Sequence, residues 1–233
     1  MSPNIGRERK LITVLFADVV DSTAIAEQMD PEDWSSTMNR TFDLMAEAVH
    51  RNEGTVAQFL GDGILAFFGA PIAHEDDAQR AVSAALQIQN SIATFASELN
   101  RDDDIALRVR IGINTGPVIV GRVGSMKSGT YSAIGDTLNT ASRVQSAAEP
   151  STVSVTESTY RLVSKAFDAT DLGEIEVKGK AAPVHCYRIA GPRQPDPVAE
   201  SAATLRSTLI GRQEQLAELS QLVSALNQGR GGV

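Results

Sequence analysis

Apolar and polar residues recur along the chain with the period of strands in some segments and of helices in others. Short apolar or alternating runs predict the first four strands at residues 10–17, 55–60, 64–69 and 105–114. Between them, apolar residues recur at helical spacing from Pro31 to about Arg51, and again from His74 to about Leu99. The elements therefore follow the order β-α-β-β-α-β.

This order is typical of a ferredoxin-like sheet that carries both helices on one face. Right-handed crossovers place the first and third strands side by side at the centre of such a sheet. After this core, residues 116–121 and 129–134 predict a projecting hairpin, and Gly135 opens a further helix. Three strand-like segments then close the domain, at residues 152–155, 172–178 and 183–189. The expected fold class is α+β, a ferredoxin-like βαββαβ core with a C-terminal extension.

Two carboxylates come together in this topology. Asp18 ends the first strand, just before the helix-start cluster Asp21-Ser22-Thr23, and Asp62 lies in the tight turn Gly61-Asp62-Gly63 before the third strand. Neighbouring carboxylates at a strand end can hold two divalent cations ~3.5 to 4 Å apart, as in-line phosphoryl chemistry requires. The alternative is that Asp18 only ends a strand and Asp21 only caps a helix.

A second candidate pair lies on the helix that opens at Gly135. Asn139 and Arg143 are one helical turn apart and share a face. An amide and a guanidinium there could orient an attacking hydroxyl and neutralise charge on a phosphorane. Taken alone, the pattern also fits a solvated helix face.

Composition narrows the classes of function. The 233 residues, 42% of them hydrophobic, include no apolar run near the ~20 residues that cross a bilayer. The single cysteine, Cys186, fits a reducing compartment, and we expect a cytoplasmic protein. The net charge of −8 argues against nucleic acid as a partner, and it makes a bound cation more necessary for an anionic ligand.

The chain is expected to contain more than its catalytic domain. Residues 1–9 are polar and predicted to be disordered, and residues 10–190 form the domain. A proline-containing linker at 191–207 leads to a helical segment at 208–233. That segment is too short for a core of its own, so it is interpreted as the start of a longer module.

Several motifs resemble the catalytic domain of bacterial class III adenylyl and guanylyl cyclases, over roughly residues 10–190. The motifs are Phe16-Ala-Asp-Val-Val-Asp-Ser-Thr23, Leu60-Gly-Asp-Gly63, Gly112-Ile-Asn-Thr-Gly-Pro-Val118, Gly135-Asp-Thr-Leu-Asn-Thr-Ala-Ser-Arg143 and Val177-Lys-Gly-Lys180. The resemblance implies an adenylate cyclase that converts ATP to 3′,5′-cyclic AMP and pyrophosphate. It also implies two divalent cations, Mg²⁺ or Mn²⁺, as cofactors.

The resemblance assigns roles to individual residues. Asp18 and Asp62 are expected to hold the metals, with the Val19 carbonyl as a further ligand. Asn139 and Arg143 are the expected transition-state pair. Residues expected to bind the substrate, apart from its base, are Ser22, Thr23, Gly61 and Lys178. In this family the metal acids and the Asn/Arg helix of one site come from different subunits, so the resemblance implies a head-to-tail homodimer.

Two positions depart from the adenylyl cyclase pattern, and both concern the base. Gln58 stands where a lysine is usual, and Ser132 stands where an aspartate is usual. Both side chains can donate or accept, so they could serve adenine or guanine. Guanylyl cyclases usually carry Glu and Cys there, so ATP is predicted as the substrate, with GTP side activity, and a guanylate cyclase is the alternative.

Other interpretations remain open. The domain could be a degenerate cyclase that binds nucleotide or dimerises to regulate an attached module. A cyclic-dinucleotide synthase would need a Gly-Gly-Asp/Glu-Glu-Phe turn, which Leu60-Gly-Asp-Gly63 is not, and a polymerase palm would lack the Asn/Arg helix. The segment Ile210-Gly-Arg-Gln-Glu214 resembles the start of an NTPase module often fused behind such cyclases, but no phosphate-binding loop follows it in this chain.

Overall fold

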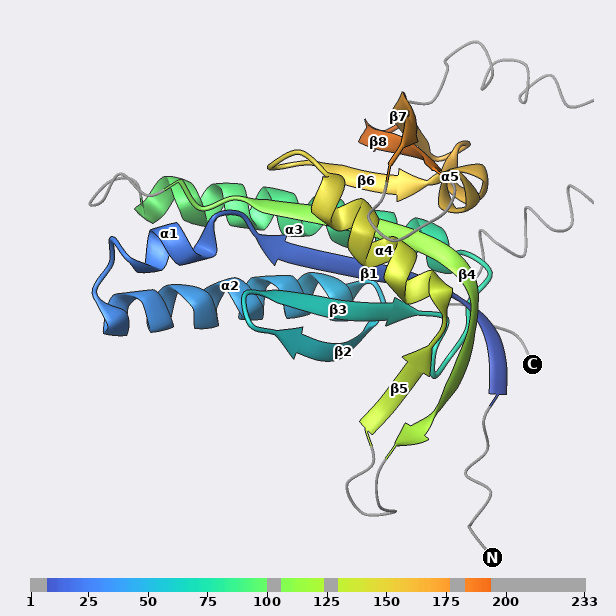
Figure 1. Cartoon of the computed structure of the whole chain (residues 1–233), viewed down its shortest axis with the longest axis horizontal. Coiled ribbons are helices and arrows are strands. Elements are labelled where there is room, and N and C mark those ends of the chain that lie inside the picture. The colour runs from blue at the N-terminus through green and yellow to red at the C-terminus, as the bar shows by residue number, and fades with distance from the viewer. Residues whose placement is uncertain (1–7, 100–105, 124–129, 177–182, 194–233) are drawn as a thin grey trace, which may run out of the picture. The chain divides into compact units, whose positions relative to one another are not determined.

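The computed structural model describes residues 8–99, 106–123, 130–176 and 183–193 (Figure 1). The chain divides into two units, residues 1–193 and 194–233, and the second lies outside the described residues. The predicted linker beyond residue 193, the NTPase-like segment and Lys178 therefore also lie outside them. No helix in the described residues is both long enough and apolar enough to cross a bilayer.

One mixed sheet organises the described residues. Seven of its strands follow the order β2-β3-β1-β4-β6-β8-β7, and β5 pairs with β4 outside this path. The strands are β1 (Glu8–Val19), β2 (Thr55–Leu60), β3 (Gly63–Phe68), β4 (Val109–Val123), β5 (Thr130–Ile134), β6 (Val153–Thr156), β7 (Phe167–Ile175) and β8 (Val184–Pro192). The helices are α1 (Ser22–Ala26), α2 (Pro31–Arg51), α3 (Asp77–Leu99), α4 (Asp136–Ala147) and α5 (Glu157–Val163).

The predicted ferredoxin-like core is confirmed. Strand β1 lies between β3 and β4 and pairs with both in antiparallel fashion. The first and third strands are thus neighbours, as the right-handed crossovers require. The three strands are built from β-branched and other apolar residues, and their central residues are buried.

Helix α2 has its predicted bounds, whereas α3 begins at Asp77 and not at the predicted His74. The Asp30 side chain accepts a hydrogen bond from Glu32 N at 2.9 Å, and Pro31 fits the first helical position. Met38, Met45 and Val49 form its buried stripe. The helix ends at Arg51, the residue at which the sequence pattern placed its end.

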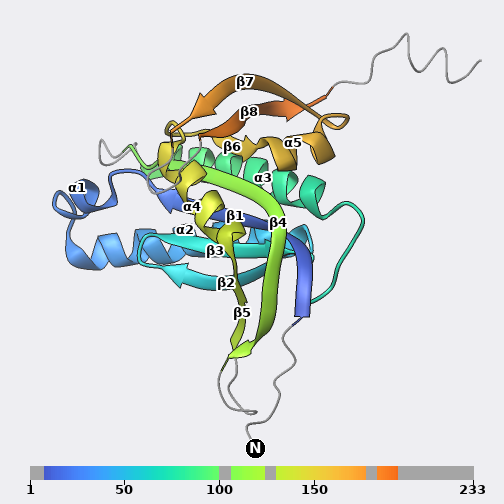
Figure 2. The ribbon, with the colours of Figure 1, turned by 45° about the vertical axis from the view of Figure 1, so that its right-hand side comes forward.

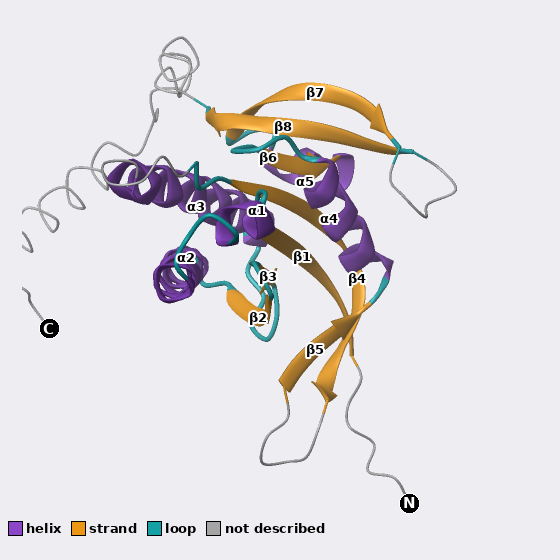
Figure 3. Ribbon diagram, turned by 60° about the vertical axis from the view of Figure 1, so that its left-hand side comes forward, coloured by secondary structure: helices purple, strands orange, loops and turns teal. Residues whose placement is uncertain are grey.

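The two faces of the sheet are covered by different helices. Helices α2, α3 and α5 pack over one face, against core residues such as Leu15, Ala17 and Val19 of β1. Helix α4 crosses the opposite face, where Val14 packs with Ala141 (Figure 3). Successive residues of β1 thus serve two separate cores, which is why its sequence is nearly continuously apolar.

Some elements differ from their predictions. Strand β4 continues without a break from Val109 to Val123, so the first arm of the predicted hairpin is the end of a core strand, and it projects with β5 from the body (Figure 2). Pro117 does not interrupt β4, because it still lies opposite Leu11 of β1 in the pairing. Helix α1 was predicted only by its start, at Asp21-Ser22-Thr23, and α5 was not predicted; each spans less than two turns and shows no clear apolar period.

Candidate active site

Asp18 and Asp62 lie together where β1 ends. Asp18 is paired with Gly63 across the β1–β3 ladder. The Val19 N–H donates to the Asp62 carbonyl at 3.1 Å, which fastens the turn to the strand end. The strand order therefore brings the two predicted metal acids side by side, with the backbone of Val19 between them.

The glycines of the turn are needed for this approach. Gly61 has a φ of +58°, in the left-handed region that favours glycine. A Cβ on Gly63 would lie 2.2 Å from the Ala17 carbonyl oxygen, which is part of the backbone and has no room to move. A larger residue at Gly63 would therefore push the turn away from β1, and one at Gly61 would strain the turn through its positive φ.

Helix α1 begins directly after β1, but its start differs from the prediction. Asp21 is the N-cap residue with a φ of 55°, and its side chain makes no capping hydrogen bond. It lies instead 3.8 Å from Arg108 Nη2. Ser22 Oγ donates to Asp62 Oδ2, so this hydroxyl orients a carboxylate, while Thr23 is exposed in the first turn.

The environment of the two carboxylates separates their pKa values. Burial, together with the hydrogen bond and the negative charge of Asp62, raises the pKa of Asp18 from 3.8 to about 6, against the opposing effect of Arg110. Partial burial also acts on Asp62, but hydrogen bonds from Ser22 and Asp18 outweigh it and hold its pKa below the usual value. Without a cation, the first proton that the pair takes up is therefore expected on Asp18.

Two neighbours of Asp18 were missed by the sequence analysis. Arg110 Nη2 and Gln145 Nε2 each lie 3.2 Å from Asp18 Oδ2 and donate to it. Arg110 is opposite Asp18 in the β1–β4 pairing, so the strand register is the signal that would have identified it. Gln145 reaches Asp18 from α4 and is almost fully buried.

The donor set fits hard divalent cations. Two carboxylates and a backbone carbonyl are oxygen ligands of the kind that Mg²⁺ and Mn²⁺ prefer. The buried Nε–H of Arg110 has no hydrogen-bond partner among the described residues; it needs an acceptor oxygen and does not itself indicate a cation. No group of three or more His, Cys, Asp or Glu side chains in the described part of the chain could hold a metal by itself. Cations here would therefore need further ligands, such as substrate phosphates.

Asn139 and Arg143 lie on α4 and point away from this carboxylate pair. Their side chains make no hydrogen bond or ion pair with another described residue, and Asn139 is exposed. At about 100° per residue, Gln145 lies about 140° around the helix from the midpoint of the two. Because Gln145 faces Asp18 of its own chain, the Asn139/Arg143 face is directed elsewhere.

The remaining predicted residues lie along the edge of the domain. Gln58 is exposed on β2, beside a bulge between Val56 and Gln58. Ser132 lies on β5, where its backbone pairs with Gly121, and β5 approaches β2. The structure therefore brings the strands of the two predicted base-contacting residues near each other. Lys178 lies outside the described residues.

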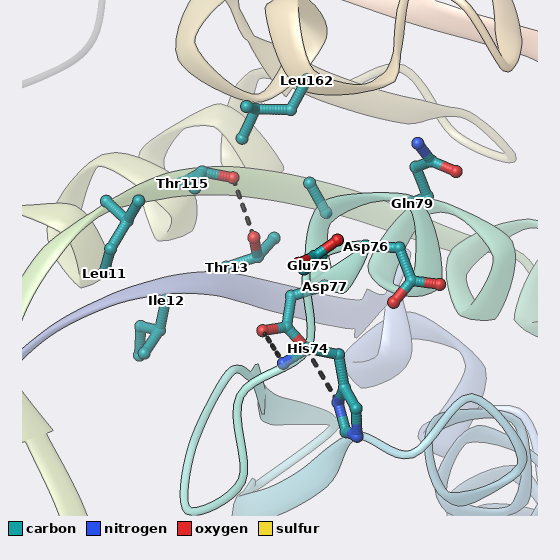
Figure 4. Close-up of a pocket in the computed structure, with 11 residues that line it drawn as sticks. Leu11, Ile12, Thr13, His74, Glu75, Asp76, Asp77, Gln79, Thr115 and Leu162 are labelled. Atoms are coloured by element: carbon teal, nitrogen blue, oxygen red, sulfur yellow. Dashed lines mark hydrogen bonds and ion pairs between the residues drawn. The ribbon is translucent and has the colours of Figure 1, made fainter.

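A separate hollow lies at the start of α3, on the face of the sheet that α2, α3 and α5 cover (Figure 4). Its volume is about 170 Å³, and its lining includes His74 and Asp77. His74 lies between two carboxylates, with Nε2 3.2 Å from Glu53 and Nδ1 3.4 Å from Asp77. The hollow is smaller than a typical ligand pocket and its charged groups face one another, so we assign it no nucleotide.

Comparison with known proteins identifies the class of the domain. Its α+β architecture is the class III cyclase fold, as in the adenylyl cyclase CyaB of P. aeruginosa, a solved structure with a TM-score of 0.77 and 30% identity over 81% of this chain and 98% of that chain. Residues 7–191 match the family described as the adenylate and guanylate cyclase catalytic domain. The chain therefore belongs to that family.

Curated relatives carry both activities in their names. Adenylate cyclase 1 of Rhizobium meliloti (strain 1021) is 33% identical over 186 residues, which cover 78% of this chain and 28% of that protein. The soluble guanylate cyclase subunit beta-2 of Rattus norvegicus is 33% identical over 174 residues, 74% of this chain and 25% of that protein. The chain thus spans only about a quarter of the length of these relatives.

Proposed function

We propose that the domain is an adenylate cyclase that converts ATP to 3′,5′-cyclic AMP and pyrophosphate, with GTP as a weaker substrate. The observation that carries this proposal is the Asp18–Asp62 pair at the end of β1, set against the Asn139/Arg143 face of α4. The first group of residues suits a metal-bound triphosphate, and the second suits a reacting ribose and phosphorus. A cyclase needs both in one site.

The two groups serve one site only if two copies of the chain combine. Within one chain, α4 turns its Asn139/Arg143 face away from Asp18, so the pair completes the site of a second copy. In a head-to-tail homodimer, each of two equivalent sites then takes its carboxylates from one subunit and its α4 pair from the other. Exposed apolar side chains along the projecting edge of the domain offer a surface for this contact: Phe59, Ile119 and Ile134.

The reaction is attack of the ribose 3′-oxygen on the α-phosphorus, with pyrophosphate as the leaving group. Asn139 orients the ribose, and Arg143 neutralises charge that develops on the phosphate oxygens. The first backbone N–H groups of α1, at Ser22 and Thr23, have no partner within the helix and can donate to phosphate oxygens beside Gly61. Lys178 is assigned to the terminal phosphates. Two divalent cations, Mg²⁺ or Mn²⁺, supply charge neutralisation and a lower pKa for the 3′-hydroxyl when bound at Asp18, Asp62 and the Val19 carbonyl.

The wider setting of the domain is also inferred. Residues 208–233 resemble the start of an NTPase module, and we infer that such a module, attached at the C-terminal side, regulates the cyclase. The protein is proposed to act in the cytoplasm. A catalytically weak domain that binds nucleotide and regulates such a module is the second candidate function. Its supporting observation is that Gln58 and Ser132 depart from both familiar base-reading pairs.

The direct test is product formation from ATP and from GTP, each with Mn²⁺ and with Mg²⁺. We expect cyclic AMP from ATP, resolved by chromatography from linear products, and slower formation of cyclic GMP from GTP. The rate per protein should rise with protein concentration, because the sites form only in the dimer. No cyclic product at high protein concentration would contradict the cyclase assignment and favour the regulatory domain.

Gln58→Glu is expected to shift the preference between the two bases. A carboxylate can only accept, so it favours guanine, which presents N–H donors on its Watson–Crick edge, over adenine N1. We expect the GTP-to-ATP ratio of kcat/KM to rise about tenfold, the effect of roughly one hydrogen bond. Gln87→Glu, on α3 and remote from β5, is a matched control that should leave the ratio unchanged. An unchanged ratio in Gln58→Glu would exclude Gln58 from base recognition.

A further inference from the structure

Helix α4 is docked on β4 along a row of three alternate residues, Gly112, Asn114 and Gly116. Residues spaced by two lie on one face of a strand, and this face meets α4. A Cβ on Gly112 would lie 2.2 Å from the Gln145 backbone nitrogen, and one on Gly116 would lie 2.7 Å from Thr137 Oγ1. The two glycines therefore let the helix approach the strand backbone, and Asn114 is the one side chain between them.

Asn114 connects the first turn of α4 to the junction of β6 and α5. Its Nδ2 donates to the Thr137 carbonyl oxygen at 3.0 Å. Its Oδ1 accepts from Thr156 Oγ1 at 2.8 Å and from Ser158 Oγ at 3.1 Å. A carbonyl oxygen can only accept, so the bond to Thr137 fixes which end of the amide faces the helix. Asn114 is only 7% exposed, so these bonds are protected from water.

Two side-chain hydrogen bonds join the first turn of α4 to β4. In one, Asn114 donates to the Thr137 carbonyl, and in the other, Thr137 Oγ1 donates to the Pro117 carbonyl at 2.8 Å. The N-cap residue, Gly135, has no side chain to cap the helix, and Asp136 beside it makes an interaction of its own. Asn139 follows Thr137 by only two residues. Since Asn139 and Arg143 bond no other described side chain, the helix alone sets where they lie.

We propose that Asn114 is a positioning residue that fixes the first turn of α4 and thereby places Asn139 and Arg143 in the active site. This inference rests on the proposed function, because it concerns the residues assigned there to the transition state. Loss of the Asn114 bonds lets α4 shift or tilt on β4, and a displacement of about 1 Å can lower a rate about 100-fold. Asn114 has no hydrogen bond to Asp18 or Asp62, and Gln145, which does bond Asp18, lies in the last turn of α4, so metal binding is expected to change much less than kcat.

The first test is the kinetics of Asn114→Ala. We expect kcat to fall about 10- to 100-fold, while the Mn²⁺ concentration for half-maximal activity changes less than about twofold. Thr115→Val is the matched control: Thr115 is the next residue and nearly as buried, at 9% exposure. Its Oγ1 bonds Thr13 of β1 at 2.9 Å (Figure 4) and Thr159 of α5 at 3.0 Å, so neither partner is on α4.

Both variants are expected to lower Tm, but only Asn114→Ala should lower kcat by tenfold or more. Equal losses of kcat in the two variants would reduce Asn114 to a structural role and overturn the proposal. Thr137→Val, which removes the hydrogen bond from Thr137 Oγ1 to the Pro117 carbonyl while keeping the side-chain shape, should follow Asn114→Ala in direction. A folded Asn114→Ala or Thr137→Val protein with wild-type kcat would also overturn it.

Mixing experiments then assign Asn114 to one half of the site. With Asp18→Ala, the Asn114→Ala subunit supplies intact carboxylates and receives an intact α4, so activity should rise. In a mixture of Asn114→Ala with Arg143→Ala, both subunits have a defective α4, so no site is intact. Its activity should stay about tenfold below that of the mixture with Asp18→Ala. The reverse pattern would overturn the proposal. A failed mixture of Asp18→Ala with Arg143→Ala would refute the shared sites instead, and the kcat comparison with Thr115→Val would then decide on Asn114.

Discussion

Asp18→Asn is expected to lower cyclic nucleotide formation about 1000-fold or more, because it removes one of the two carboxylates that bind the catalytic cations. Asparagine keeps nearly the same shape and can still accept hydrogen bonds from Arg110 and Gln145. The loss should therefore be confined to chemistry and metal binding. Product formation from ATP with saturating Mn²⁺ measures it.

The same substitution should not destabilise the metal-free protein at pH 8. The folded-state pKa of Asp18 is raised from 3.8 to about 6, mainly by burial and also by Asp62, so the native state binds this proton more tightly than the unfolded chain does. Its stabilising contribution is complete below pH 4 and is lost as the pH rises towards 6. Asparagine behaves like the protonated acid, so Tm at pH 8 should equal or exceed that of the wild type.

Controls separate this effect from a general loss of folding. Mn²⁺ should raise the Tm of the wild-type protein at pH 8 and leave that of Asp18→Asn nearly unchanged. Asp76→Asn serves as the matched variant, because Asp76 is a half-exposed carboxylate that pairs with Arg80 at the start of α3. It should keep its activity and its response to Mn²⁺. More than a tenth of wild-type activity in Asp18→Asn would remove Asp18 from the metal site.

The sequence predicts the carboxylate pair because the pair depends only on the order of strands and helices along the chain. Asp18 ends an apolar strand, and Asp62 lies in a glycine-bounded turn, both of which are local signals. The β-α-β-β-α-β order then makes their strands neighbours through the handedness of the crossovers. No knowledge of side-chain contacts is needed for that step, and the structure agrees with it.

The contacts around the pair depend instead on register and packing. Arg110 faces Asp18 only because of the alignment of β1 with β4, and a shift of one residue would turn it to the other face. Gln145 reaches Asp18 only because Gly112 lets α4 lie close to β4. Ser22 was expected at a helix start, but its hydroxyl donates to Asp62. These contacts depend on tertiary structure, so the pattern of apolar and polar residues does not predict them.

The hydrogen bonds of Asn114 also could not be predicted from the sequence, because they depend on how the helices pack on the sheet. In the sequence Asn114 follows Ile113 on the non-apolar positions of an alternating run, where it looks like a residue on the exposed face of a strand. Only the pairing of β4 with β6 and the approach of α4 give its amide three partners. Its burial, and with it the need of its amide for hydrogen-bond partners, is therefore known only from the structure.

A mixture of Asp18→Ala and Arg143→Ala is expected to recover activity that neither protein has alone. Each variant should be at least about 100-fold below the wild type, one for loss of a metal ligand and the other for loss of charge neutralisation. In a heterodimer, one site combines both defects and the other combines intact carboxylates with an intact α4. Random pairing makes about half of the dimers mixed, each with one working site of two, so about a quarter of wild-type activity should return.

The mixing result discriminates sharply because the alternatives predict no recovery. If Asp18 and Arg143 served the same site within one chain, every subunit in the mixture would be defective, whatever it paired with. Asp18→Ala mixed with Asp62→Ala is the matched control: both defects lie in the same half, so no combination is intact and activity should stay low. Recovery in the first mixture and none in the second would assign the carboxylates and α4 to opposite subunits. Equal inactivity in both, with mixed dimers verified by mass, would contradict the composite site and require α4 to move towards Asp18 within one chain.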